Sequence, residues 1–286
     1  MRLHTRAPGK VNLCLYVGAP RADGRHPLVS VVQAVTLADE LTLEPSSGGA
    51  GPDEVVCPAV AGPNLAARAL AAFRDATGWD APPVRLTIAK RVPVAAGMGG
   101  GSADAAAALR LASHAAGGTD PALLLELAAG LGGDVPALLE PGRVLMLDAG
   151  ERVRGLREPQ PFGVLLLPSA HQLSTRDVYA AFDRLGAARG GAELAELERA
   201  IEPLTPEHVH NDLQAAALEL CPPIADALAA VEQAGAAYSL VSGSGPTVAG
   251  FFPGIEGVER AAAAARALGG IAARPVAPGY AAVREA

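Results

Sequence analysis

Runs of apolar and β-branched residues in the first half of the chain predict a set of strands. They lie at 11–17, within 28–43, at 55–56, at 84–89 and at 144–147. Apolar residues at helical spacing, such as Leu65, Leu70 and Phe73, predict helices between these strands. The predicted helices cover 64–77, where Asn64 is well placed as the N-cap, 103–116 and 121–130.

The second half of the chain also alternates between short strands and helices. Strands are predicted at 163–167, 238–241, 248–252 and the C-terminus, and helices at 176–185, in pieces through 233, and at 258–268. Between the two halves, residues 155–161 combine a glycine, two prolines and several charges, which is typical of a linker. We therefore predict a boundary near residue 156 and domains at 1–155 and 156–286. Mixed strands and helices in two halves argue against an all-helical or all-parallel fold.

Composition narrows the class of protein. The chain has 286 residues, 50% hydrophobic and 19% charged, so it can bury a sizeable core. The formal net charge of −7 and the lack of a dense Lys/Arg run argue against a nucleic-acid partner. The sequence has neither a membrane span of roughly 18 apolar residues nor the apolar stretch of a signal peptide near its start.

The cysteines and histidines do not indicate a metal site. Cys14, Cys57 and Cys221 are odd in number and scattered, which favours free thiols in a cytoplasmic protein. The six histidines show no metal-ligand spacing, so we assign no metal-ligating residue.

The strongest local feature is the segment PVAAGMGGGSAD at 93–104, between a predicted strand and a predicted helix. Glycines let successive backbone N–H groups converge and leave room for a phosphate to approach. The following helix adds unpaired N–H groups and a partial positive charge at its start. Ser102 can either cap this helix or place its hydroxyl near a phosphate or Mg²⁺. The segment matches neither a P-loop nor a Rossmann fingerprint, so it favours phosphate binding of another type.

Three further segments each allow two interpretations. Lys10 and Asn12 lie two apart on a predicted strand, and their shared face either serves a polar site or leaves a lysine exposed at a strand edge. Asp134 follows a predicted helix on a tight turn, where it either bonds its own backbone or orients an acceptor hydroxyl in phosphoryl transfer. Residues 242–247, SGSGPT, form either a hairpin or a second anion-binding loop.

Taken together and in this order, these segments resemble the GHMP kinase superfamily across the full chain. The shared motifs are a lysine-bearing N-terminal strand, a P-x₃-G-[LM]-G-x-x-[SA]-A loop and a late glycine-rich loop. The resemblance implies an α+β fold in two parts, an N-terminal ATP-binding domain like the second domain of ribosomal protein S5 and a C-terminal ferredoxin-like substrate domain. It also implies a kinase that uses ATP and Mg²⁺ to phosphorylate a small molecule.

Several segments resemble one branch of the superfamily, whose acceptor is a cytidine diphosphate-linked methylerythritol. They are RADGRH at 21–26, GDVP at 133–136, STRDVY at 174–179, NDL at 211–213 and LVSGSGPT at 240–247. The implied reaction is phosphorylation of the acceptor's 2-hydroxyl in isoprenoid precursor biosynthesis, by a monomer or weak homodimer. The alternatives are a related kinase with a homoserine- or mevalonate-like acceptor and a non-catalytic nucleotide-binding sensor. The presence of both Lys10 and Asp134 argues against the sensor.

The resemblance also implies roles for particular residues. Lys10 and Asp134 are the expected catalytic pair, with Asp134 aligning or deprotonating the acceptor hydroxyl. Asn64 is expected near the adenine, and the ATP phosphates on the loop formed by Pro93, Val94, Ala95, Ala96, Gly97, Met98, Gly99, Gly100, Gly101, Ser102 and Ala103. His26 is expected to hydrogen-bond the cytosine and Tyr179 to stack on it, the two facing each other across a base-sized slot. Contacts to the sugar alcohol or diphosphate are expected from Asn12, Thr175, Gly243, Ser244 and Gly245.

Three positions depart from the pattern of that branch. Arg25 stands where a tyrosine usually helps to sandwich the cytosine, although a guanidinium can stack on a base or bind a phosphate. Gly9 replaces the usual alanine, and Ala103 replaces a frequent second serine after the GGGS run. The first departure bears on the substrate, whereas the other two hardly affect the kinase assignment.

Overall fold

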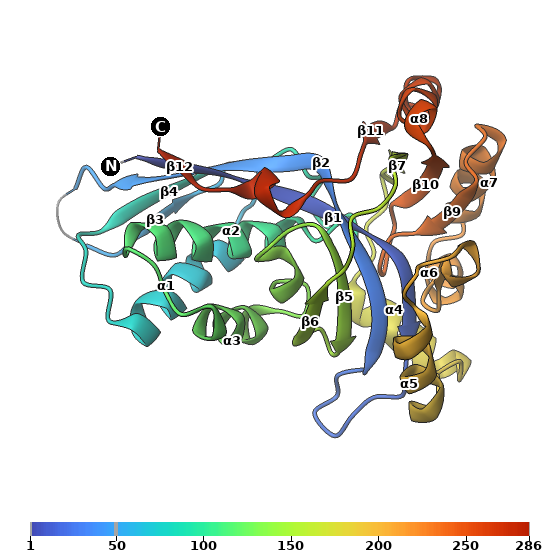
Figure 1. The fold of residues 1–286 in the computed structure, drawn as a ribbon, viewed down its shortest axis with the longest axis horizontal. Coiled ribbons are helices and arrows are strands. Elements are labelled where there is room, and N and C mark those ends of the chain that lie inside the picture. The colour runs from blue at the N-terminus through green and yellow to red at the C-terminus, as the bar shows by residue number, and fades with distance from the viewer. Residues whose placement is uncertain (1, 49–50, 286) are drawn as a thin grey trace.

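The computed structural model describes residues 2–48 and 51–285, which form two sheets with helices packed on them (Figure 1). The first sheet has the order β12-β1-β2-β4-β3, and β5 and β6 extend it from the other end of β2. Its strands are β1 (Leu3–Val17), β2 (Leu28–Pro45), β3 (Glu54–Val56), β4 (Val84–Ala89), β5 (Arg143–Asp148), β6 (Arg152–Gly155), β8 (His210–Asn211) and β12 (Arg284–Glu285).

Strands β1 and β2 form a long antiparallel hairpin in the middle of the first sheet (Figure 1). The strand predicted to begin at Val11 in fact begins at Leu3, so the segment with Pro8 and Gly9 lies within it. A register shift between Pro8 and Lys10 accommodates the proline, which has no N–H to give to the ladder. At this irregularity the Lys10 N–H leaves the sheet and donates to the Met98 carbonyl at 2.9 Å. The irregularity therefore joins the lysine to the glycine-rich segment.

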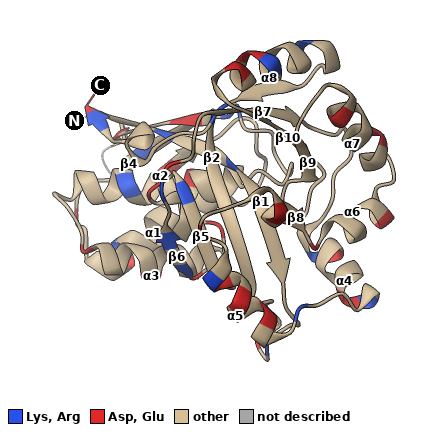
Figure 2. Cartoon of the chain, turned by 45° about the vertical axis from the view of Figure 1, so that its right-hand side comes forward, with Lys and Arg blue, Asp and Glu red and all other residues tan. Residues whose placement is uncertain are grey.

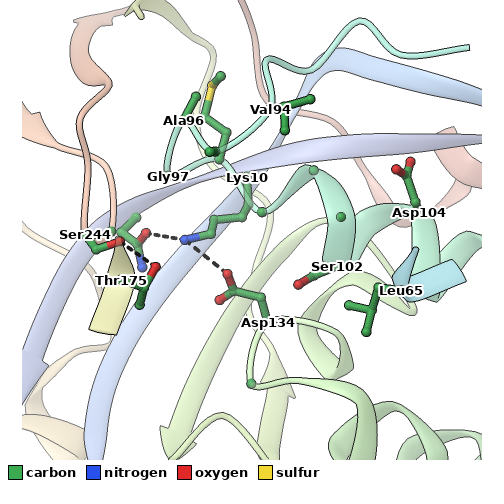
Figure 3. A pocket seen from close by; sticks show the side chains of 18 of the residues that line it. Lys10, Leu65, Val94, Ala96, Gly97, Ser102, Asp104, Asp134, Thr175 and Ser244 are labelled. Carbon is green, nitrogen blue, oxygen red and sulfur yellow. Dashed lines mark hydrogen bonds and ion pairs between the residues drawn. The ribbon is translucent and has the colours of Figure 1, made fainter. Parts of the chain in front are cut away.

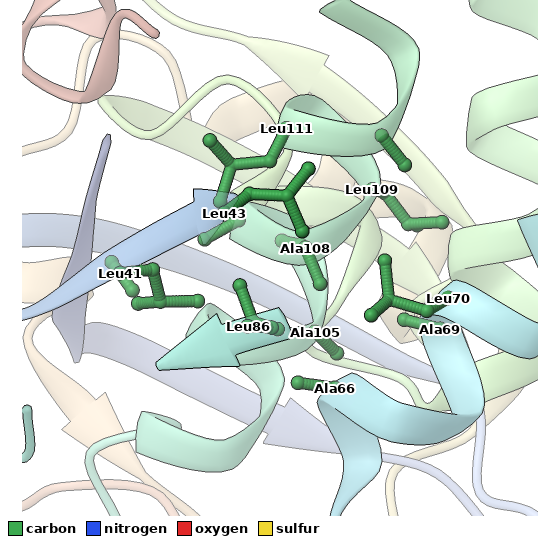
Figure 4. Close-up of a cluster of buried hydrophobic side chains, with 14 of the residues drawn as sticks. Leu41, Leu43, Ala66, Ala69, Leu70, Leu86, Ala105, Ala108, Leu109 and Leu111 are labelled. Carbon is green, nitrogen blue, oxygen red and sulfur yellow. The ribbon is translucent and has the colours of Figure 1, made fainter. Parts of the chain in front are cut away.

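Helices α1 (Leu65–Thr77), α2 (Gly100–Ala115) and α3 (Pro121–Leu131) pack beside one another below the first sheet (Figure 1). Leucines of the sheet, among them Leu41 and Leu86, meet alanines and leucines of α1 and α2 in the core (Figure 4). All alanines of α2 except Ala115 are almost completely buried, so small side chains let the helix lie close to its neighbours. Helix α2 is thereby fixed rigidly under the sheet.

Helix α2 starts at Gly100, three residues before the predicted start at Ala103. Its N-cap, Gly99, has φ 66°, a left-handed conformation that favours glycine. Gly100 and Gly101 then enter the first turn, where a glycine run had indicated a loop. The tight turn at Gly99 therefore determines the direction in which helix α2 starts.

The second sheet is antiparallel, with the order β11-β7-β10-β9. Its strands are β7 (Phe162–Leu167), β9 (Tyr238–Val241), β10 (Val248–Pro253) and β11 (Ile271–Ala273). Numbered by their order along the chain, the four strands lie in the order 4-1-3-2 with helical crossovers. This is the ferredoxin-like arrangement that the resemblance to GHMP kinases implies. The helices of this half are α4 (Thr175–Leu185), α5 (Gly191–Ala200), α6 (Gln214–Leu220), α7 (Ile224–Gln233) and α8 (Ile255–Leu268).

The two halves of the chain share the first sheet. Strand β6 ends at Gly155 and β7 begins the second sheet at Phe162, but β8 and β12 return to pair with β1. The predicted C-terminal strand is thus two short ones, β11 and β12, joined through the 3₁₀ turn η3 (Pro278–Ala281). The division into domains 1–155 and 156–286 stays a prediction.

Charged residues are spread over both halves of the molecule. Figure 2 shows Lys and Arg interspersed with Asp and Glu on the outer helices rather than gathered in one stripe. Of the helices in the described residues, none combines the length and apolarity needed to cross a membrane.

Candidate active site

A cavity of about 570 Å³ lies where the two sheets meet. This is the size of an ordinary small-molecule site. Its walls come from β1, the segment before α2, the turn after α3, the start of α4 and the β9–β10 loop. All but four of the sequence-predicted site residues line it: Lys10, Asn12, Asn64, Pro93, Val94, Ala95, Ala96, Gly97, Met98, Gly99, Gly100, Gly101, Ser102, Asp134, Thr175, Tyr179, Gly243 and Ser244.

Lys10 is buried on the floor of this cavity, with 4% of its surface exposed. Its Nζ donates to Asn12 Oδ1 at 2.7 Å and lies 3.5 Å from Asp134 Oδ2 (Figure 3). Asn12 is itself fixed, because its Nδ2 donates to Ser30 Oγ at 2.9 Å. An ammonium has three N–H donors and Asn12 accepts only one of them, so Lys10 can still donate to an anion in the cavity. The strand-edge interpretation of Lys10 is therefore wrong.

The two glycine loops touch each other at the cavity. Gly97 has φ 75°, and a Cβ built on it would lie 2.5 Å from the Ser242 carbonyl oxygen and 2.7 Å from that of Gly245. Only glycine fits such a close approach of two backbones. Ser242 Oγ also donates to the Gly97 carbonyl at 3.3 Å. The late loop thus supports the early one, besides lining the cavity.

The start of α2 presents its N–H groups to the cavity. The first intrahelical bond runs from Ala103 N to Gly99 O at 2.8 Å, so the N–H groups of Gly100, Gly101 and Ser102 precede it. Within the described residues, no side chain caps this helix, so the interpretation of Ser102 as a cap is wrong. Ser102 instead points into the cavity (Figure 3). Unpaired N–H groups at a helix start bind anions such as phosphate.

Sequence reasoning missed a buried ion cluster at the same end of the cavity. Lys90 Nζ contacts Asp39 Oδ2 at 2.5 Å and Asp104 Oδ2 at 2.8 Å, and Lys90 and Asp104 both line the cavity. Asp39 Oδ1 accepts from the backbone of Val92 at 2.8 Å and fixes the approach to the glycine loop. Asp104 Oδ1 is buried and has no hydrogen-bond partner in the described part of the chain. The only sequence signal was the position of Lys90 and Asp104 on either side of the loop.

The cluster predicts an unusual pH dependence of stability. Burial raises the pKa of Asp104 from 3.8 to about 7, and the charge of Lys90 offsets this only partly. Between about pH 4 and 7 the folded chain therefore keeps a proton that the unfolded chain has released, so Asp104 makes folding less favourable as the pH rises. Asp104→Asn should raise the melting temperature on the order of 5 °C at pH 8 and little at pH 4.5. Thermal unfolding at both pH values measures this. A variant that melts no higher than wild type at pH 8 contradicts it.

On the acceptor side, Thr175 Oγ1 and Ser244 Oγ lie 3.0 Å apart and join α4 to the late glycine loop. Tyr179, one turn further along α4, also lines the cavity. Burial and the nearby charge of Asp134 raise the pKa of Tyr179 to about 12, so its hydroxyl keeps its proton at neutral pH. These groups offer hydroxyl donors and acceptors to a polar ligand.

The structure contradicts the expectation of a base-sized slot between His26 and Tyr179. Their ring centroids are 4.8 Å apart with a tilt of 43°, whereas a base between two rings needs about 7 Å. His26 is held by Asp183, whose Oδ1 lies 2.8 Å from Nε2, and its ring therefore covers one side of Tyr179. A ligand ring could stack only on the side of Tyr179 that faces the cavity.

Four predicted residues lie outside the cavity lining. Ala103 is part of the core under the sheet, and Gly245 has a left-handed conformation of φ 77° in which a Cβ would meet the Val241 side chain at 2.8 Å. His26 contacts Tyr179 and Asp183, as described above, and lies edge-on to Phe182 with the ring centroids 6.2 Å apart. Arg25 turns to the β5–β6 hairpin, where its Nη2 donates to the Ala149 carbonyl at 2.7 Å.

Comparison with known proteins places this geometry in a family. Residues 64–142 match the family model of the GHMP kinases N terminal domain, and residues 177–271 match that of the GHMP kinases C terminal. The 4-diphosphocytidyl-2-C-methyl-D-erythritol kinase of Streptomyces coelicolor is 44% identical over 263 residues, 87% of each chain. That of Anaeromyxobacter sp. (strain K) is 42% identical over 283 residues, 95% of this chain and 88% of the relative.

Solved structures agree with these matches. A crystal structure of a 4-(cytidine 5'-diphospho)-2C-methyl-D-erythritol kinase superposes with a TM-score of 0.77 and 32% identity, over 96% of this chain and 99% of the other. A homoserine kinase from Cytophaga hutchinsonii reaches 0.69 at 16% identity, over 99% and 97%, and shares the fold. The chain is therefore an ATP-dependent small-molecule kinase of the GHMP family, and within that family it belongs to the 4-diphosphocytidyl-2-C-methyl-D-erythritol kinases.

Proposed function

We propose that this protein transfers the γ-phosphoryl group of ATP to the 2-hydroxyl of 4-diphosphocytidyl-2-C-methyl-D-erythritol, in non-mevalonate isoprenoid precursor biosynthesis. The observation that carries the proposal is the Lys10–Asp134 pair, 3.5 Å apart in a cavity bounded by two glycine loops. The acceptor is taken from the relatives that are 44% and 42% identical to this chain. A cytoplasmic location is in keeping with its three free cysteines. A monomer or weak homodimer is expected, which sedimentation would test.

In this proposal, Asp134 and Lys10 act on the two ends of the transfer. The Asp134 carboxylate accepts a hydrogen bond from the acceptor hydroxyl and takes its proton as that oxygen bonds to the γ-phosphorus. The bond from this phosphorus to the oxygen that bridges it to the β-phosphorus breaks, and ADP leaves. Lys10 uses an N–H that Asn12 does not accept to hold a γ-phosphate oxygen, and its charge offsets the negative charge on that group. Since Asn12 fixes the ammonium, Lys10 needs no rearrangement when the substrates bind.

ATP would lie along the early glycine loop. The N–H groups at the start of α2 would hold its phosphates, and the adenine would lie near Asn64. Asn64 caps α1 through Oδ1, which accepts from Ala66 N at 2.8 Å, so its Nδ2 is left for the base. In this arrangement the loop needs glycines because the phosphates approach its backbone closely, and no loop side chain has to bind them.

Mg²⁺ fits the oxygen groups of the site. The described residues contain no cluster of three or more His, Cys, Asp or Glu side chains that could hold a metal by themselves. Ser102 Oγ and the Asp134 carboxylate are hard oxygen donors that face the same space, and together with ATP phosphate oxygens and water they suit Mg²⁺ (Figure 3). When bound, the ion would neutralise charge on the β- and γ-phosphates.

The acceptor would occupy the opposite wall. Thr175, Ser244 and the backbone of Gly243 would contact its sugar alcohol or diphosphate, and the cytosine would stack on the cavity-facing side of Tyr179. The acceptor hydroxyl would then meet the γ-phosphate at the Lys10–Asp134 pair.

The test is ADP release with Mg-ATP and a panel of acceptors: the cytidyl compound, homoserine, mevalonate and galactose. We expect kcat/KM for the cytidyl compound to exceed that for every other acceptor by at least about a hundredfold, because the site would leave polar groups unpaired with the wrong ligand. Preference for homoserine or mevalonate would retain the kinase and reject the acceptor. ATP binding without turnover of any acceptor would favour a nucleotide sensor.

A further inference from the structure

Arg25 does not face the cavity, although its motif suggested a role in substrate binding. Its side chain crosses to the β5–β6 hairpin, 124 residues away in sequence. There Nη2 donates to the Ala149 carbonyl at 2.7 Å, and Nη1 lies 3.5 Å from Glu151 Oε1. The guanidinium is thus engaged with the protein itself rather than presented to a ligand.

The peptide of Ala149 is held on both sides. Its N–H donates to Glu151 Oε2 at 2.6 Å, while its carbonyl accepts from Arg25. Glu151 is itself fixed by Arg21, whose Nη2 lies 2.9 Å from Oε1. The turn between β5 and β6 is therefore clamped by the arginines of the RADGR segment.

The clamped turn supports the backbone that precedes Asp134. A Cβ built on Gly133 would lie 2.8 Å from the Ala149 carbonyl oxygen and 3.9 Å from Arg25 Nη2. A Cβ built on Gly150 would lie 2.2 Å from the Gly133 carbonyl oxygen. The two turns are thus in backbone-to-backbone contact, and a shift of one has to move the other.

The Asp134 side chain has few restraints of its own. Within the described residues its carboxylate makes no hydrogen bond, and its only ion pair is the 3.5 Å contact with Lys10. About a third of the side chain is exposed, at 32%. Its place in the cavity is therefore set mainly by the backbone at Gly133.

We propose that Arg25 is a positioning residue for Asp134, which it holds through Ala149 and Gly133, and that it does not bind the cytosine. The proposal deepens the proposed function and rests on Asp134 being the group that meets the acceptor hydroxyl. In this proposal the RADGR turn at 21–25 holds the catalytic Asp134 in place. Recognition of the base then falls to residues of the cavity itself.

Arg25→Met tests this, since methionine keeps an unbranched chain but has no donor for Ala149. A misplacement of about 1 Å at a reacting group can cost about a hundredfold in rate. We expect kcat to fall about 10- to 100-fold and KM for each substrate to stay within about twofold, because only transition-state contacts are lost. Arg25→Lys, which can still donate to the Ala149 carbonyl, should restore most of kcat.

Arg152→Met is the matched control. Arg152 lies on β6 and pairs with Asp148 and Glu198, with side-chain exposure of 55%. It should leave kcat within about twofold. A rise in the acceptor KM of Arg25→Met with kcat unchanged would overturn the proposal, as would an unchanged enzyme.

Two further measurements distinguish a failure of the positioning role of Arg25 from a failure of the proposed function. On an Asp134→Asn background, Arg25→Met should cost less than about twofold more, because the two residues act as one unit; full additivity would overturn the proposal. Crystal structures of wild type and Arg25→Met should show the Gly133–Asp134 backbone displaced by about 1 Å. This readout needs no acceptor, so an undisplaced turn overturns the positioning role even if the acceptor has been misassigned.

Discussion

Asp134→Asn is expected to lower kcat by about a thousandfold and to leave KM for ATP and acceptor within about threefold. Asparagine has the shape of aspartate, but it cannot take a proton and it carries no charge to pair with Lys10 Nζ at 3.5 Å. Positioned general bases contribute about 10² to 10⁴ in rate. Steady-state ADP release with both substrates varied measures kcat and KM separately.

The size of the loss distinguishes two roles of Asp134. If the carboxylate only orients the acceptor hydroxyl, the amide oxygen can still accept its hydrogen bond, and a loss within about tenfold is expected. Such a small loss would contradict proton transfer to Asp134. Asp226→Asn is the matched control, because Asp226 is exposed on α7, outside the cavity lining, and its substitution should change neither constant.

The parts of the site that the sequence predicted are those made by local backbone geometry. A glycine run between a strand and a helix determines its own phosphate-binding shape, and the loop indeed lines the cavity from Pro93 to Ser102. The ferredoxin-like order of the second sheet was implied by the resemblance to a family and not by any local pattern. Local patterns erred where tertiary contacts override them. The first strand was predicted to begin at Val11, yet β1 begins at Leu3 and continues through Pro8 and Gly9 by shifting its register against β2.

The parts that the sequence did not reveal depend on contacts between distant segments. Asp39 lies on β2, Asp104 on α2 and Lys90 in the segment between β4 and α2, and single charged residues ordinarily indicate a solvated surface. Arg25 resembled a ligand group because its motif lies beside His26, but its actual partner is a carbonyl on another hairpin. No spacing along the chain encodes such a pairing, so only the fold could show it.

Lys90→Met is expected to destabilise the folded protein by about 3–5 kcal/mol. Burial disfavours the charge on Lys90, but Asp104 and Asp39 outweigh it and raise its pKa, so the ammonium holds two carboxylates that are nearly inaccessible. Removing the one cation of a buried cluster leaves charges that the interior cannot solvate. Urea unfolding at pH 8, above the pKa of about 7 of Asp104, should show the midpoint falling with little change in slope.

Two further variants test whether this loss of stability comes from the charge of Lys90 or from the packing of its side chain. Arg91→Met removes the neighbouring cation, which pairs with Glu40 at the surface with 61% of its side chain exposed, and should cost less than about 1 kcal/mol. Adding Asp104→Asn to Lys90→Met should recover part of the lost stability, because one uncompensated carboxylate disappears. Equal losses for Lys90→Met and Arg91→Met, or a double variant no more stable than Lys90→Met, would mean that packing of the lysine stem, and not charge, holds this end of the cavity together.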